Sequence, residues 1–167
     1  VAERAYQKAR DFAIERLQGR SANSKSSNPT IIIDHPDVKR MLLSMKCQIE
    51  ATRSLAYYVA GKIDISKKHS NSDVRNKAQI IVDLLIPVVK AWSSDTGIEV
   101  ANTGLQVHGG MGFIEESGAP QFFRDSRIAS IYEGTNGIQA NDLVGRKLFL
   151  NGGAGIKLLI NLIRKSL

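Results

Sequence analysis

The sequence predicts an all-α protein, an antiparallel four-helix bundle with additional short helices toward the C-terminus. Apolar residues recur at steps of three and four over about 36–65, and again from 72 or 73 to 108. Only the polar turn KKHSNS (67–72) separates these two stretches, and no segment shows the strict alternation that is typical of a β-strand. Two long amphipathic helices joined by so short a turn are expected to pack side by side in opposite directions.

Helical spacing near the N-terminus predicts a first helix that runs to about Leu17. A loop rich in Gly, Ser and Asn follows over 19–30. Asp34 is the expected N-cap of the first long helix, with Pro36 in its first turn.

Ser72 or Asp73 is the expected cap of the second long helix, which should end at Gly109-Gly110. Pro87 lies inside its pattern, and because the apolar stripe continues on both sides we expect a kink there and no break. Three shorter helices are expected over 119–129, 136–150 and 154–165.

Composition indicates one globular domain over residues 1–167, with 43% hydrophobic and 23% charged residues. The one cysteine cannot form an internal disulfide, which favours a reducing compartment: the cytoplasm of a bacterium, or the mitochondrial matrix in a eukaryote. The net charge of +7 is not accompanied by interleaved aromatic residues, so we expect no nucleic-acid partner. Apolar runs are much shorter than the ~20 residues of a transmembrane helix, and we expect no membrane span.

Two common kinds of site find little support. The segment Gly109-Gly110-Met111-Gly112 follows no predicted strand and is followed by no GK[ST], so neither a P-loop nor a Rossmann turn is indicated. The three histidines are too scattered to predict a metal site, and we expect none. His108 is expected to be a polar residue at a helix end.

Candidate chemistry concentrates in the stretch RDSRIASIYEGTNGIQANDLVGRKL, residues 124–148. Glu133 lies between the apolar approach Ile131-Tyr132 and Gly134, where one helix gives way to the next. In an apolar pocket this carboxylate would be suited to act as a general base, because desolvation raises its basicity. Gly134 would let a ligand approach the backbone, and Thr135 or Asn136 could cap the next helix beside a ligand phosphate. The alternative is that Glu133 is a solvent-exposed turn residue and Thr135 only an N-cap.

The blocks IYEGT and NGIQ, with RDSRI before them and QVHGGMGF about 25 residues upstream, resemble the C-terminal helical domain of the flavin-dependent acyl-CoA dehydrogenases. The resemblance covers essentially the whole chain and matches that family's C-terminal four-helix bundle. The segments HPDVKRMLLSMK and YEGTNGIQANDLVGRKL are most similar to the longer bacterial-type members of the family, which include the methylmercaptopropionyl-CoA dehydrogenases.

The resemblance implies that Glu133 is the catalytic base. It would remove the α-proton of an acyl-CoA thioester while the β-hydrogen leaves as hydride to FAD, giving a trans-2-enoyl-CoA. Tyr132 and Gly134 would line the thioester. A Glu133→Gln change is therefore expected to abolish flavin bleaching by acyl-CoA with FAD still bound.

The resemblance also implies FAD as cofactor and assigns contacts to it. These contacts are Arg16 and Gln18 of an Arg-x-Gln unit, Gln106, Gly109, Gly110 and Thr135, several of them reaching the cofactor of a neighbouring subunit in a homodimer or homotetramer. An electron-transfer flavoprotein is the implied electron acceptor. The chain departs from the family at Gly19-Arg20, where an aromatic residue and Gly are usual, at Gly137 in place of a common Gln, and near Pro36, where another Gln is often found.

The family enzymes also have an N-terminal helical domain and a middle β-domain, neither of which we find in this sequence. We therefore expect an isolated C-terminal domain that alone neither holds FAD tightly nor turns over substrate. Two other interpretations stay open. One is an acyl-CoA oxidase, distinguished by peroxide production. The other is a non-catalytic helical module for oligomerisation or binding, which an exposed Glu133 far from any intersubunit cleft would favour.

Overall fold

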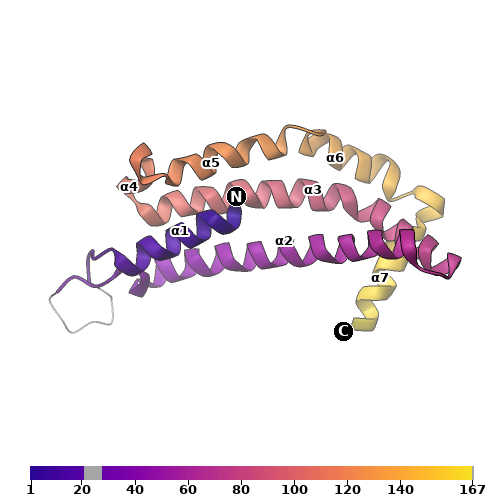
Figure 1. The fold of residues 1–167 in the computed structure, drawn as a ribbon, viewed down its shortest axis with the longest axis horizontal. Helices are drawn as coiled ribbons and strands as arrows, with labels where there is room; N and C mark the ends of the chain where they lie inside the picture. The colour runs from indigo at the N-terminus through magenta and orange to yellow at the C-terminus, as the bar shows by residue number, and fades with distance from the viewer. Residues whose placement is uncertain (21–27, 167) are drawn as a thin grey trace. The chain divides into compact units, whose positions relative to one another are not determined.

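The computed structural model describes residues 1–20 and 28–166 and confirms the all-α prediction. Within those residues the chain is helical, and its β-type pairing is limited to one isolated bridge between Leu17 and Ile31. The long helices α2 (Pro36–Lys68) and α3 (Ser72–His108) run antiparallel on either side of a three-residue turn (Figure 1). The chain divides into two compact units, and each contains one half of α2 and one half of α3.

Unit 1 comprises Val1–Ala51 and Ser94–Ala129. Besides its halves of α2 and α3 it contains α1 (Ala2–Glu15), the 3-10 turn η1 (Ile32–Asp34), α4 (Gly110–Phe113), the 3-10 turn η2 (Glu115–Ser117) and α5 (Ala119–Arg127). The core is made of buried apolar residues from α1, η1, α2 and α3: Ala9, Ala13, Ile32, Met41, Leu42, Met45, Ile49, Val100 and Val107.

A stripe of alanines lets α1 approach α3 closely. Ala5, Ala9 and Ala13 recur every four residues, so they share one face of α1, and all three are buried. They meet α3 at Gly104, where an added Cβ would lie 3.6 Å from the Ala5 carbonyl oxygen and 3.6 Å from Met45 Cε. Small residues on both helices therefore fix how deeply α1 packs in unit 1.

Unit 2 comprises Thr52–Ser93 and Ser130–Leu167. It contains α6 (Asn136–Asp142), the π-helical turn η4 (Leu143–Lys147), the 3-10 turn η5 (Leu150–Gly153) and α7 (Ala154–Ser166) beside its halves of α2 and α3. A further 3-10 turn, η3 (Ile128–Ser130), crosses the boundary between the units. The core centres on Val59, Ile81 and Leu85, against which Leu158 and Leu159 of α7 pack.

Both predicted caps of the long helices were wrong by one or two residues. His35, not Asp34, precedes α2, because a residue before proline is confined to extended backbone and the helix starts at Pro36. Asp34 ends η1 instead. Asn71 caps α3: its Oδ1 accepts hydrogen bonds from the amides of Asp73 and Val74, at 2.8 and 3.2 Å. Asn, Ser and Asp are about equally good N-caps. Asn71 is the cap because its side chain is the one placed to reach the first free amides of α3.

Other boundaries differ in smaller ways. α1 ends at Glu15 because Arg16 is extended (φ −74°, ψ 120°) and its carbonyl accepts a hydrogen bond from Ile32. The predicted helix over 136–150 changes at Leu143 into the π-helical turn η4. α3 continues unbroken through Pro87, as expected. Of the predicted loop 19–30, residues 21–27 lie outside the part that the structure describes.

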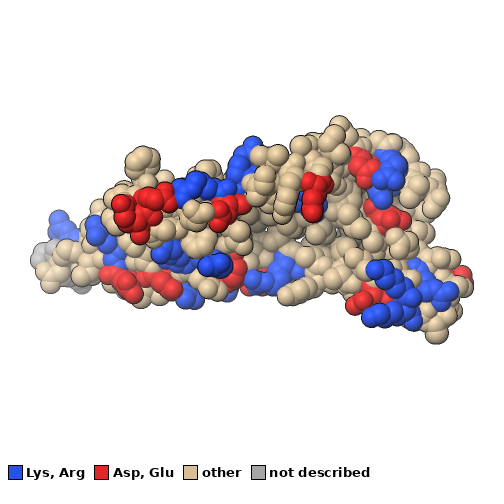
Figure 2. Space-filling view, turned by 45° about the horizontal axis from the view of Figure 1, so that its top comes forward, with Lys and Arg blue, Asp and Glu red and all other residues tan. Residues whose placement is uncertain are grey.

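Charged side chains of both signs mix on the surface. On the face shown in Figure 2, Lys and Arg lie among Asp and Glu along the helices and form no continuous stripe of one sign. Specific pairs such as Arg40–Asp37 and Arg146–Asp142 account for part of this mixing. Much of the positive surplus thus lies on ordinary solvated helix faces.

Candidate functional site

The turn between η3 and α6 carries Glu133 in a conformation that L-residues rarely adopt. Glu133 has φ 54° and Gly134 has φ 81°, so two consecutive residues are left-handed. Among the described residues the only other non-glycine with positive φ is Asn151, and asparagine tolerates this region better than glutamate. A left-handed glutamate costs about 1–2 kcal/mol, and the surrounding contacts must enforce it.

Two side chains hold the carbonyl groups of this turn. Lys90 Nζ, from α3, lies 2.7 Å from the Gly134 carbonyl oxygen, and Gln139 Nε2, from α6, lies 3.3 Å from the Glu133 carbonyl oxygen. Both are donors, so both left-handed residues have a tethered carbonyl. The sequence offered no local sign of the first tether, because Lys90 is 44 residues from Gly134.

The start of α6 fixes the other end of the turn. Thr135 is the N-cap, as predicted, and its Oγ1 accepts a hydrogen bond from the Ile138 amide at 3.2 Å. Asn136 follows as the first helical residue and joins α6 to α3: its Nδ2 donates to the Ala91 carbonyl at 3.2 Å, and its Oδ1 accepts from Lys90 Nζ at 2.9 Å.

Among the described residues no apolar pocket encloses Glu133, which matches the alternative of a solvent-exposed turn residue. Glu133 is exposed, and so are Tyr132 (52%), Ile131 (48%) and Ile138 (57%) around it. The apolar neighbours thus form an exposed rim next to the carboxylate and do not cover it. Exposed apolar groups beside a carboxylate are typical of a surface that a ligand or a partner covers.

Arg16 and Gln18 lie where α1 ends in unit 1. Their backbone is fixed by the Arg16 carbonyl, which accepts from Ile32 at 2.8 Å, and by the Gln18 amide, which donates to Thr30 at 3.0 Å. His35 Nε2 is 2.8 Å from the Gln18 carbonyl oxygen. The side chains of Arg16 and Gln18, the two predicted contacts to FAD, are both exposed.

Gln106, Gly109 and Gly110 lie at the end of α3, also in unit 1 and also exposed. Gly109 has φ 59° and ψ −136°, a conformation that glycine adopts readily, and it starts the short helix α4, which the sequence did not predict. Just before it, the His108 ring stacks on Phe12 of α1, with centroids 4.5 Å apart. Phe12 is one turn from Arg16, so the ends of α1 and α3 lie at the same end of unit 1 (Figure 1).

His108 is a structural residue. It is 5% exposed, and its Nδ1 donates to the Gly104 carbonyl oxygen at 2.7 Å. Burial lowers the pKa of His108, and the charge of Lys8 lowers it further, while the bond to Gly104 acts in the opposite direction. The prediction of a polar residue at a helix end is therefore confirmed.

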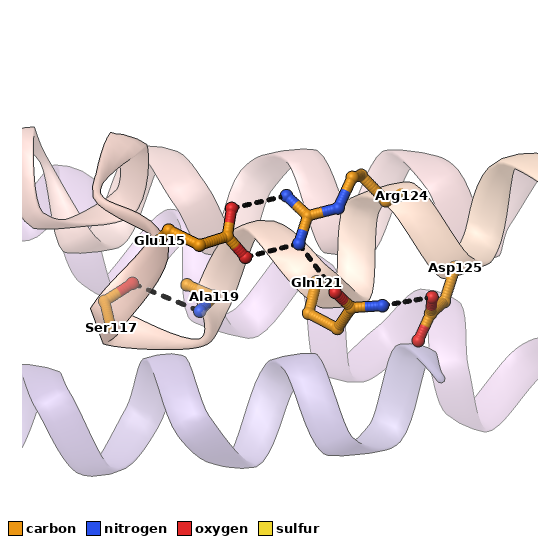
Figure 3. A network of polar contacts seen from close by, with 6 residues as sticks. All are labelled: Glu115, Ser117, Ala119, Gln121, Arg124 and Asp125. Carbon is orange, nitrogen blue, oxygen red and sulfur yellow. Dashed lines mark hydrogen bonds and ion pairs between the residues drawn. The ribbon is translucent and has the colours of Figure 1, made fainter.

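A groove of about 520 Å³ borders this segment and is lined partly by Gln106, Gly109 and Phe113. The groove is also lined by Arg124, whose guanidinium makes a bidentate ion pair with Glu115 and donates a hydrogen bond to Gln121 Oε1 at 2.6 Å (Figure 3). The pairing with Arg124 lowers the pKa of Glu115. This network joins η2 to α5 and makes one side of the groove rigid.

The predicted site residues thus form two groups. Tyr132, Glu133, Gly134 and Thr135 are consecutive in unit 2, on a strained turn with an apolar rim. The predicted cofactor contacts at the ends of α1 and α3 are brought together in unit 1. Sequence reasoning missed Lys90 and Gln139, which hold the first group in place, and it named Asn136 only as an alternative cap of the helix.

The chain belongs to the acyl-CoA dehydrogenase C-terminal domain family, whose model matches residues 1–148. It is 48% identical over 153 residues to the 3-methylmercaptopropionyl-CoA dehydrogenase of Ruegeria pomeroyi, a match that covers 92% of this chain and 26% of the relative. The chain spans about a quarter of the length of the curated relatives that it matches first.

Solved structures agree with this family. Butyryl-CoA dehydrogenase from Megasphaera elsdenii matches with a TM-score of 0.65 and 28% identity, over 88% of this chain and 33% of that one. A chain in a solved structure of the electron transferring flavoprotein of Acidaminococcus fermentans matches with a TM-score of 0.69 and 27% identity, over 90% of this chain and 33% of that one. No helix among the described residues has the length and hydropathy to span a bilayer.

Proposed function

We propose that this chain is the catalytic-base domain of an FAD-dependent acyl-CoA dehydrogenase, with Glu133 as the base and an acyl-CoA thioester as the substrate. The observation that carries the proposal is the conformation of one residue in a chain of this family. Glu133 is an exposed carboxylate held at φ 54° although that backbone costs free energy. A turn with no role beyond connecting η3 to α6 gains nothing from a glutamate there.

In this proposal the Glu133 carboxylate takes the α-proton of the thioester and becomes a carboxylic acid. The pair of electrons from the broken C–H bond forms the new double bond as the β-hydrogen departs as hydride. When bound, FAD supplies the two-electron acceptor for that hydride. Tyr132 and Gly134 border the carboxylate on either side in sequence, which suits them to line the thioester.

The residues at the ends of α1 and α3 suit a dinucleotide with a pyrophosphate. Arg16 offers an exposed guanidinium, which can bind phosphate oxygens in a bidentate manner. The exposed backbone of Gly109 and Gly110 allows close approach, since an added Cβ at either position meets no atom within 4 Å. Gln18, Gln106 and Thr135 are the further proposed contacts to FAD.

Electron transfer to an electron-transfer flavoprotein and a homodimeric or homotetrameric assembly complete the proposal. One structural relative is a chain in a solved structure of such a flavoprotein, and this likeness motivates the choice of acceptor. Measuring peroxide production during turnover distinguishes the two acceptors. An oxidase would release one peroxide for each enoyl-CoA formed.

The test is a Glu133→Gln substitution in the full-length enzyme that contains this domain. Gln preserves size and removes the base, so acyl-CoA should no longer bleach the flavin, with a loss in rate of at least about 10³-fold, while FAD stays bound. Glu116→Gln, at another exposed glutamate of the chain, is the matched control and should bleach normally. Bleaching of Glu133→Gln at the normal rate would refute the assignment.

A separate substitution tests the cofactor contacts. Arg16→Gln removes the guanidinium while the backbone of the segment stays bonded to Ile32. The variant enzyme should lose FAD during gel filtration, and its flavin absorbance per protein should fall. An unchanged flavin content would remove Arg16 from the proposal.

A further inference from the structure

Lys90 reaches the Glu133 turn from the middle of a helix far away in sequence. It lies on α3, partly buried, in the same unit as the turn. Its ammonium donates to the Gly134 carbonyl oxygen at 2.7 Å and to Asn136 Oδ1 at 2.9 Å. One cation therefore joins the last left-handed residue of the turn to the first residue of α6.

Asn136 completes this connection from the other side. Its Nδ2 donates to the carbonyl oxygen of Ala91, the residue after Lys90, at 3.2 Å. Adjacent residues of α3 thus hold both the turn and the helix start, one by a side chain and one by the backbone. The two attachments together prevent α6 from sliding along α3 without breaking hydrogen bonds.

The strained backbone explains why so many attachments converge here. A glutamate at φ 54° relaxes to ordinary backbone unless its neighbours prevent it. The Gly134 carbonyl is the group that would swing if Glu133 relaxed, because rotation about the Glu133 backbone reorients the following peptides. Lys90 holds that carbonyl with a charge-assisted hydrogen bond, which is stronger than a bond between neutral groups.

We propose that Lys90 is a positioning residue for the Glu133 carboxylate: it holds the Gly134 carbonyl so that Glu133 stays left-handed and its side chain keeps the direction that proton transfer requires. This inference rests on the proposed function, since it assigns Lys90 a part in the step that Glu133 performs. Misplacing a catalytic group by about 1 Å can cost about 10²-fold in rate. Lys90 therefore acts on kcat through Glu133 and touches neither substrate nor cofactor.

The test is Lys90→Met in the full-length enzyme, because Met keeps most of the side-chain length and removes the ammonium. We expect kcat to fall about 10- to 100-fold, with KM changed by less than about threefold and with FAD content unchanged. Lys90→Arg, which keeps a cationic donor, should recover most of the lost rate. In hydrogen exchange, the amides of 131–139 should exchange faster in Lys90→Met than in the unaltered enzyme.

A matched control separates positioning from folding. Lys147 is another partly buried lysine of unit 2 and pairs with Asp83 at 3.7 Å, away from the Glu133 turn. Lys147→Met likewise removes a partly buried ammonium from unit 2 and should leave kcat unchanged. If Lys90→Met does not fold, Lys90→Gln provides the same test, because Gln keeps a polar side chain at this partly buried position but removes the charge and is too short to reach the Gly134 carbonyl as the ammonium does.

Each outcome bears on one assignment. If Lys90→Met keeps the unaltered kcat, or if Lys147→Met loses kcat to the same degree, the positioning role is overturned. If Lys90→Arg recovers nothing while its FAD content stays normal, the role is overturned as well. Glu133→Gln reports separately: full turnover in that variant refutes Glu133 as the base, whereas its inactivity together with a fully active Lys90→Met refutes only the role of Lys90.

Discussion

Replacing Glu133 with glycine should raise the free energy of unfolding of the chain, although the change removes the proposed base. The left-handed backbone at φ 54° costs a glutamate about 1–2 kcal/mol, and glycine adopts it freely. Glycine gives back about 0.5–1 kcal/mol through its greater freedom in the unfolded chain. The side chain is exposed, so its removal costs little packing. The expected net effect is a gain of about 0.5–1 kcal/mol.

The assay compares Glu133→Gly with Glu133→Gln in thermal unfolding of the 167-residue chain. Both variants remove the negative charge, but only glycine relieves the backbone, so their difference isolates the strain. At about 2–4 °C for each kcal/mol in a protein of this size, Glu133→Gly should unfold about 1–4 °C above Glu133→Gln. If the two variants unfold at the same temperature, the turn is not strained, and backbone strain does not support Glu133 as the base.

Two further predictions concern unit 1. Gly112→Ala should destabilise the chain by at least about 1–3 kcal/mol in chemical denaturation, because an added Cβ would lie 2.2 Å from the Leu105 carbonyl oxygen; Gly110→Ala, whose Cβ meets nothing within 4 Å, should have little effect. His108 should make stability pH-dependent, because burial lowers its pKa from the ordinary 6.5. The folded chain therefore binds fewer protons than the unfolded chain in this pH range. The contribution of His108 to stability is full above about pH 6.5 and falls as the pH drops below that value. In His108→Gln the decrease in unfolding midpoint between pH 7.5 and 5.5 should be smaller, and an equal decrease would contradict this origin.

Helical periodicity predicted the long helices well because it depends only on residues three and four positions apart in the sequence. The stripes over 36–65 and 72–108 correspond to α2 and α3, and the predicted stretch 154–165 corresponds to α7. Helix ends depend on which of several neighbouring polar side chains reaches the free amides. At 71–73 three consecutive residues can each cap a helix, and spacing alone did not select Asn71.

In the candidate site, too, the features set by local sequence were predicted and those set by tertiary packing were not. Glu133 and Thr135 could be singled out because their local sequence places a carboxylate and an N-cap at a break between helices, and the structure has the cap there. The tether from Lys90 depends on how α3 packs beside α6, which no local pattern encodes. The local sequence left the exposure of Glu133 open, because it did not show that apolar neighbours such as Ile131 are themselves exposed.

That exposure bears on how the proposed base works. A carboxylate surrounded by water is a weak base, and a low-dielectric environment makes it stronger. This chain supplies the direction of Glu133 through its strained, tethered backbone and supplies an apolar rim at Ile131, Tyr132 and Ile138, but it leaves the carboxylate exposed. If Glu133 is the base, the bound acyl-CoA and further protein surface must exclude water from it. Proton abstraction by Glu133 would then require substrate to cover the exposed rim first, so it would be coupled to substrate binding.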